Sequence, residues 1–113
     1  MRDEEEYIEL IEALKEFSED NLIVVEGKKD VAALKAIGVK SKELNGNNYL
    51  FAERNSSTKQ VLLLTDFDDE GENIRKKLKE AFSANGVQEN VNLRKKFWAV
   101  TRLSHVEGLK PSK

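Results

Sequence analysis

The sequence predicts an α/β fold in which a mainly parallel, four-stranded sheet lies between helices, as in Rossmann-like proteins. Two apolar runs, Leu22–Val25 and Val61–Thr65, are continuous rather than alternating, which is typical of strands buried on both faces. Segments with helical spacing separate these runs from two weaker strand candidates, so strands and helices alternate along the chain. Right-handed crossovers between parallel strands are the default connection for such an order.

The N-terminal third is expected to form a helix, a strand and a second helix. Residues 3–17 combine apolar side chains at helical spacing with acids in the first turn, where the helix dipole favours them. The strand Leu22–Val25 ends at Glu26-Gly27. Helical spacing then returns from Lys28 to Ile37 and stops at Gly38.

The remaining elements are expected to continue this alternation. Val39–Leu44 is a weaker strand candidate, closed by a strong turn signal at residues 45–48. Val61–Thr65 is the best strand of the chain. Trp98 lies in the last predicted strand and is therefore assigned to the core. The other expected elements are helices at 49–54 and 70–82, a final strand at 97–100 and a C-terminal tail at 104–113.

Length and composition limit the function classes. The 113 residues suit one domain, 1–113, and the absence of cysteine excludes a thiol nucleophile or a Cys-ligated zinc. The acidic opening is unlike a signal peptide, and no apolar run approaches a membrane span, so we expect a cytoplasmic protein. Residues 1–20 hold nine acids and two bases, a net charge of −7, which leaves +5 for the rest. That basic remainder is compatible with a nucleic-acid partner despite the overall charge of −2.

Carboxylates stand at the predicted carboxyl ends of the two best strands. Asp66 and Asp68 follow one strand, Glu26 follows the other, and Asp30 lies one helical turn further on. The carboxyl ends of parallel strands share one edge of a sheet, where ligands bind in open α/β folds. Any one of these acids could instead cap a helix or neutralise a lysine. The combination favours one or two Mg²⁺ ions, which prefer oxygen ligands and bridge to substrate phosphates.

Two sequence motifs resemble those of the Toprim domain. They are Val-Val-Glu-Gly-Lys-Lys-Asp at 24–30 and Leu-Thr-Asp-Phe-Asp-Asp-Glu-Gly-Glu at 64–72, in the family's order and each on its expected strand. This domain is found in topoisomerases, DnaG-type primases, OLD-family nucleases and a ribosomal-RNA maturase ribonuclease. The resemblance covers roughly residues 22–100 and is closest to small stand-alone members.

The resemblance implies a role for each acid. Glu26 would be the general acid or base in breaking or joining phosphodiester bonds. Asp66 and Asp68 would hold Mg²⁺, with Mn²⁺ as an alternative ion. Asp30 matches the acid that completes a second metal site in the nuclease branch. The implied catalytic residues are thus Glu26, Asp66 and Asp68, and the implied metal ligands are these three and Asp30.

Four further positions bear on the two motifs. Gly27 and Gly71 precede or open helices, leave room for close approach and provide helix amino ends that favour anions. Glu72 matches the close of the second motif. Phe67 stands where many Toprim members carry proline, a departure that alters the loop and removes no ligand.

Three functions fit these features. The first is Mg²⁺-dependent nuclease-type hydrolysis of RNA or DNA, including RNA maturation. The second is a non-catalytic module that binds nucleic acid and metal beside a partner protein. The third is an aspartyl-phosphate phosphatase with Asp66 as nucleophile, although such enzymes carry Asp-x-Asp on their first strand, and here it follows the third. A topoisomerase by itself is not expected, because the sequence leaves no room for the separate domain that carries the tyrosine nucleophile, and Tyr7 and Tyr49 are expected to lie in packing segments.

Basic and histidine side chains supply weaker signals. The clusters at 75–77 and 94–96 could contact phosphates. His105 and Arg102 could reach the same edge of the sheet. A lone histidine without a defined partner is seldom a ligand, so we expect a surface or packing role for His105.

Overall fold

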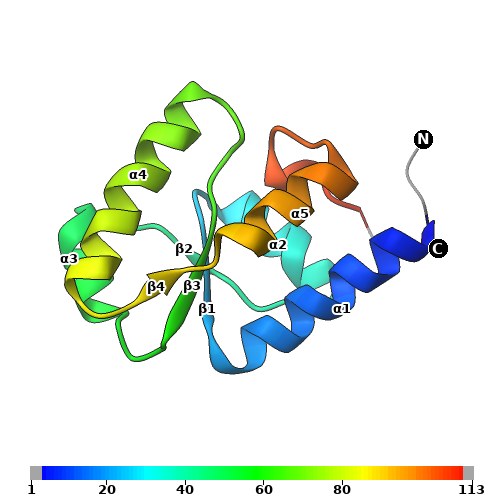
Figure 1. Cartoon of the computed structure of the whole chain (residues 1–113). Helices are drawn as coiled ribbons and strands as arrows, with labels where there is room; N and C mark the ends of the chain where they lie inside the picture. The colour runs from blue at the N-terminus through cyan, green and yellow to red at the C-terminus, as the bar shows by residue number, and fades with distance from the viewer. Residues whose placement is uncertain (1–3, 111–113) are drawn as a thin grey trace.

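Four parallel strands form the centre of the structure, a computed structural model that describes residues 4–110 (Figure 1). The strands are β1 (Leu22–Val25), β2 (Lys42–Glu43), β3 (Gln60–Leu64) and β4 (Gln88–Glu89). The α-helices are α1 (Glu4–Asp20), α2 (Lys28–Ala36), α3 (Asn48–Arg54), α4 (Asp69–Ala84) and α5 (Val91–Thr101), and a short 3₁₀ helix, η1, covers Val106–Gly108. The predicted α/β class and four-stranded parallel sheet are confirmed.

The sheet has two full strands in the middle and a two-residue strand at each edge. Its order is β2-β1-β3-β4. β1 and β3 pair along their whole common length, with Leu22 opposite Val61 and Val25 opposite Leu64. β2 and β4 each pair over only two residues. The two apolar runs therefore occupy the buried centre, as their lack of alternation predicts.

Successive side chains of the central strands enter two separate cores. Val25, Leu62 and Leu64 pack with α1, α2 and α5, whereas Val24 and Leu63 pack with α3 and α4. Figure 1 shows the two groups of helices on opposite sides of the strands. Helices thus cover both faces of the sheet, so a ligand can approach the strands only at their ends.

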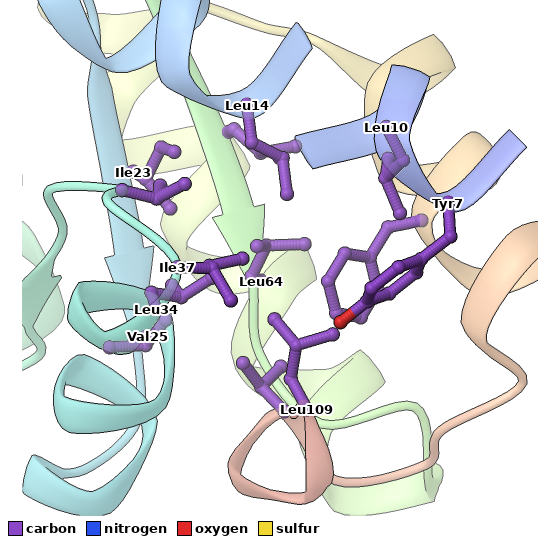
Figure 2. Close-up of a cluster of buried hydrophobic side chains, with 13 residues drawn as sticks. Tyr7, Leu10, Leu14, Ile23, Val25, Leu34, Ile37, Leu64 and Leu109 are labelled. Carbon is purple, nitrogen blue, oxygen red and sulfur yellow. The ribbon is translucent and has the colours of Figure 1, made fainter. Parts of the chain in front are cut away.

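The first core also ties the two ends of the described chain together. Tyr7, Leu10 and Leu14 extend from α1 toward Leu64, with Leu109 beside them (Figure 2). The Tyr7 hydroxyl donates a hydrogen bond to the backbone carbonyl of Lys110. α1 is the expected packing helix, and its described acidic side chains are exposed. Residue 3, where that helix was predicted to begin, lies outside the described residues.

The strand order reverses between β1 and β3. From β1 the chain passes through α2 to the edge strand β2, and from β3 it passes through α4 to the opposite edge strand β4. α2 lies on one face, and α3 and α4 lie on the other, which is what crossovers of a single hand require. In open α/β sheets the crevice at such a reversal is the usual ligand site.

The predicted final strand at 97–100 is wrong, because these residues lie inside α5. Asn90 caps this helix by accepting a hydrogen bond from the backbone N–H of Leu93, at 2.9 Å. The side chains of Arg94, Phe97 and Thr101 are buried at helical spacing, and this period prevails over the local strand preference of the Phe-Trp-Ala-Val run. The fourth strand is instead the polar pair Gln88–Glu89.

Two other predicted elements differ from the expectation. Only Lys42–Glu43 of the 39–44 segment pairs as a strand, and the tail predicted from 104 contains η1. Residues 111–113 of that tail lie outside the described part. Within residues 4–110, no helix is long and apolar enough to cross a membrane.

Candidate functional site

The carboxyl ends of β1 and β3 bring Glu26 and Asp66 into direct contact. The backbone N–H of Asp66 donates a hydrogen bond to Glu26 Oε2 at 2.7 Å. Burial raises the pKa of Glu26, and the negative charges of Asp66, Asp68 and Asp30 act in the same direction, against the hydrogen bond from Asp66. The two motifs, 40 residues apart, thus meet at the reversal of strand order.

Asp68 begins α4 as well as contributing to the site. It has an extended backbone, and its Oδ1 accepts a hydrogen bond from the backbone N–H of Gly71 at 2.7 Å, so it is the helix cap. A carboxylate has two oxygens, so capping leaves acceptor capacity on the same side chain. Asp68 is exposed, whereas Asp66 is partly buried.

Gly71 allows the segment after β3 to fold back onto α4. A Cβ at this position would lie 1.9 Å from the backbone oxygen of Asp66, so no side chain fits. The buried Thr65 hydroxyl completes the contact by donating to the Gly71 carbonyl at 2.8 Å. Gly27 differs, because a Cβ there would meet only Asp30 Oδ2, at an ordinary 3.8 Å. The close approach at Gly71 is therefore to the chain's own backbone.

His105 completes a group of three metal-ligating side chains. Its Nδ1 lies 3.2 Å from Asp66 Oδ2. One ligand atom from each of Asp66, Asp68 and His105 lies within 4.8 Å of the others. The hydrogen bond and negative charge of Asp66 raise the pKa of the exposed His105. The backbone N–H of Phe67 donates to the Ser104 carbonyl at 2.7 Å, which holds the two loops together.

His105 is exposed, as the expected surface role requires, and it also contacts Asp66, which that expectation did not include. The sequence allows His105 to reach this edge of the sheet, but its contact with Asp66 depends on how the segment after α5 returns to the sheet.

Asp30 lies beside this group without joining it. Its side chain is 6% exposed, and its Oδ2 accepts a hydrogen bond from the backbone N–H of Gly27 at 3.0 Å. Burial raises the pKa of Asp30, against that hydrogen bond. Asp30 therefore holds the Glu26-Gly27 turn, and its role as ligand of a second ion stays a prediction.

A buried arginine supports the β3 side of the site. Arg94 donates through one guanidinium nitrogen to the carbonyls of Leu63, at 2.7 Å, and Thr65, at 2.9 Å. Because β4 pairs only with Gln60 and Val61, these carbonyls have no strand beside them, and the guanidinium takes that place. Burial lowers the pKa of Arg94, and the nearby negative charge of Glu72 opposes this.

Arg75 is likewise committed to the fold. It binds Glu72 at 2.6 Å and Glu89 at 2.8 Å. Of the two basic clusters considered as phosphate contacts, the arginines Arg75 and Arg94 are therefore already bound to other groups of the fold. The flanking lysines at 76, 77, 95 and 96 are exposed.

The donor set suits a divalent cation. Two carboxylates converge, with a third, Glu26, in contact with the same backbone segment. Carboxylate oxygens suit Mg²⁺ and Mn²⁺, and an imidazole nitrogen adds a ligand that favours transition metals. Converging carboxylates repel each other unless a cation lies between them, so the residues fit a metal.

Comparison with known proteins identifies the family of this chain. The family model described as Toprim domain matches residues 21–100, which include both motifs and all four predicted acids. The chain belongs to the Toprim family. Toprim membership indicates a metal-dependent function related to nucleic acid.

Two UPF0292 proteins resemble this Toprim chain over most of its length. The protein from Archaeoglobus fulgidus is 37% identical over 110 residues, covering 95% of this chain and 89% of that one. The protein from Methanocaldococcus jannaschii is 36% identical over 107 residues, covering 88% and 84%.

Two solved structures from Aquifex aeolicus share the fold. One protein has a TM-score of 0.80 and 33% identity, covering 90% of this chain and 96% of that one. The second is the primase, solved as its zinc-binding and RNA polymerase domains, with a TM-score of 0.56 and 27% identity. It matches 71% of this chain but only 20% of the primase chain. The resemblance to the Toprim domain of primases is therefore confirmed.

Proposed function

We propose that this Toprim protein is a metal-dependent phosphodiesterase that hydrolyses bonds in nucleic acid. The observation that carries the proposal is the meeting of Glu26 with the Asp66–Asp68 segment at the strand reversal, through a contact of 2.7 Å. A protein that only binds metal would need the two aspartates. The carboxyl group of Glu26 beside them can also accept and donate a proton, which hydrolysis requires.

Asp66 and Asp68 are the proposed ligands of Mg²⁺ or Mn²⁺, with His105 as a third donor. Such an ion, when bound, neutralises charge on a phosphate oxygen and lowers the pKa of a water molecule. Asp66 and Asp68 lie in one loop and His105 lies in another. The hydrogen bond between the Phe67 and Ser104 backbones holds these loops together, which supports the joint placement of the three ligands.

Glu26 is the proposed proton-transfer residue. Its pKa is raised by burial and by neighbouring carboxylates. A raised pKa lies closer to neutral pH, where a catalytic group must both accept and donate a proton. The Asp66 backbone N–H fixes Oε2 in place, and a carboxylate has a second oxygen with which to act. In hydrolysis it would take a proton from the attacking water or supply one to the leaving oxygen.

The test is cleavage of labelled single-stranded, duplex and structured RNA and DNA with Mg²⁺ or Mn²⁺. Glu26→Gln and Asp66→Asn remove the proposed proton carrier and a proposed ligand. Glu70→Gln is the matched control, because it removes an exposed carboxylate of the same α4 turn without touching the site. We expect cleavage by the wild type and the control, and loss of about 100-fold or more in both site variants.

Three results would count against this function. Cleavage that survives both substitutions would remove the assigned roles. Binding of nucleic acid without turnover on any substrate would favour a non-catalytic module that acts with a partner protein. A trapped acyl-phosphate at Asp66 would favour the phosphatase.

A further inference from the structure

A hollow opens beside the acidic group, on the side of α5. It has a volume of about 470 Å³ and reaches from Asp68 to Trp98, with Phe67 and Val91 in its wall. This volume falls in the range of pockets that take small molecules or single groups of larger ones. Because Asp68 belongs both to the hollow and to the metal-ligating group, a bound group would lie next to the proposed chemistry.

The wall of the hollow is aromatic. The Phe67 and Trp98 rings stack with centroids 5.5 Å apart and planes 25° apart. Phe67 also stacks on the buried Phe97 at 5.8 Å, with planes 5° apart. The Arg94 guanidinium lies 4.0 Å from the centre of the Phe67 ring.

These contacts make the aromatic wall rigid. Phe97 is buried in the first core, and Arg94 is held by two backbone carbonyls. A flat ligand would therefore meet a pre-ordered surface and avoid the entropic cost of ordering the wall. Phe67 belongs to the same loop as Asp66 and Asp68, so the position of the aromatic wall relative to the acidic group is fixed.

The charged side chains around the hollow differ in whether they are already paired within the protein. Glu72, Arg75 and Arg94 line it but are paired with one another or with Glu89. Lys95 is exposed at its wall, and the exposed Arg102 guanidinium lies 5.6 Å from the centre of the Trp98 ring. The site thus offers an acidic end that suits a metal-bound phosphate, an aromatic middle and cations beyond it.

We propose that this hollow holds one unpaired nucleobase of the substrate, stacked against the Trp98 ring, with Phe67 behind it. Lys95 and Arg102 then face phosphates further along the strand, and the phosphate next to the stacked base lies toward Asp66 and Asp68. Bases have flat faces that stack on aromatic side chains irrespective of sequence. A duplex keeps its bases within the helix, so the substrate is single-stranded at this position. This inference rests on the proposed function and adds its substrate class.

The single tryptophan of the chain is the reporter. Trp98 emission is followed while a short oligonucleotide is added in the presence of Ca²⁺, and the titration is repeated with the same oligonucleotide carrying one abasic position, moved stepwise along it. We expect saturable quenching by the intact strand. Loss of the base at one position should weaken binding about 5- to 150-fold and abolish the quenching.

Variants test the wall by fluorescence anisotropy of a labelled oligonucleotide. Trp98→Ala should weaken single-strand binding by a similar factor and remove the difference between intact and abasic strands. Tyr49→Ala is the matched control, because it removes a 60%-exposed aromatic side chain from α3 and should change neither. If Trp98→Ala does not fold, as judged by circular dichroism, Trp98→Leu and the abasic series on the wild type decide the question.

The outcomes separate this inference from the proposed function. Equal binding of intact and abasic strands at every position, or tighter binding of duplex than of single strand, overturns the inference and leaves the phosphodiesterase. Failure of the wild type to bind or cleave any nucleic acid overturns the phosphodiesterase, and the inference falls with it.

Discussion

The two strand ends that form the site are built in different ways. At the end of β1, the Gly27 backbone N–H donates a hydrogen bond to the side chain of Asp30, three residues along, and Glu26 accepts one from the Asp66 backbone. At the end of β3, the Asp66–Asp68 segment is held by α4, α5 and the loop before η1, which are distant in the sequence. The Glu26-Gly27 turn is therefore closed by a contact within its own segment, whereas the Asp66–Asp68 segment also depends on contacts with distant segments. Substitutions at the β3 end should cost more.

The largest difference is expected between the two glycines. Gly71→Ala should lower the free energy of unfolding by about 4 kcal/mol or more, because its Cβ would overlap the Asp66 carbonyl. Gly27→Ala should cost no more than about 1 kcal/mol, since it meets no close atom and changes only a helix cap. Urea unfolding measures both. Equal losses would contradict the proposed difference between the strand ends.

Arg94 provides the second test. Arg94→Met should lower the free energy of unfolding by about 2–4 kcal/mol, because it leaves the Leu63 and Thr65 carbonyls without a donor. The matched control is Lys96→Met, an exposed neighbour on α5, with an expected change within about 0.5 kcal/mol. Thermal unfolding followed by circular dichroism distinguishes the two. A stable Arg94→Met protein would show that the β3 end does not need this support.

The metal ligands give a smaller expected effect. Asp68→Asn should weaken Mn²⁺ binding about 10-fold, or roughly 1.4 kcal/mol. His105→Ala should weaken Mn²⁺ binding more than Mg²⁺ binding, because imidazole suits transition metals. Electron paramagnetic resonance of Mn²⁺ and competition by Mg²⁺ measure these affinities without reference to activity. Unchanged Mn²⁺ affinity in both variants would remove the assignment.

The smallest effect concerns Glu72 and pH. The hydrogen bond from Arg75 lowers the pKa of Glu72 below its usual 4.5, so the pair stabilises the folded state above that pH and ceases to do so as the pH falls through the lowered value. Because Glu72 is 40% exposed, the contribution should be below about 1 kcal/mol. Glu72→Gln should therefore be less stable than the wild type at pH 7 and equal to it near pH 2. A constant difference across this range would contradict the linkage.

The same contrast explains what could be predicted from the sequence. Glu26, Asp66 and Asp68 follow continuous apolar runs, so a short window of sequence predicts both the strands and the acids at their ends. Membership of the Toprim family confirms the fold that the two motifs predict. The catalytic and metal roles of these residues, and of Asp30, stay predictions.

The misses all concern contacts between distant segments. The Phe-Trp-Ala-Val run favours a strand locally, but burial of Arg94, Phe97 and Thr101 against the sheet makes it helical. From the sequence, Arg94 belongs to a basic cluster and could contact phosphates. It binds backbone carbonyls at the end of β3 instead, and these are available only because β4 is short. Likewise, His105 reaches Asp66 through the return of the chain after α5. A one-dimensional pattern carries none of this information.

The two-residue strands β2 and β4 have a consequence for the behaviour of the protein at high concentration. A long exposed edge strand offers a row of free backbone groups to which another chain can add, and this is a common route to aggregation. Here each edge strand pairs over only two residues, and Arg94 occupies the carbonyls that β4 leaves uncovered. Arg94, which supports the β3 end of the site, thus also prevents a strand of a neighbouring molecule from pairing with that edge.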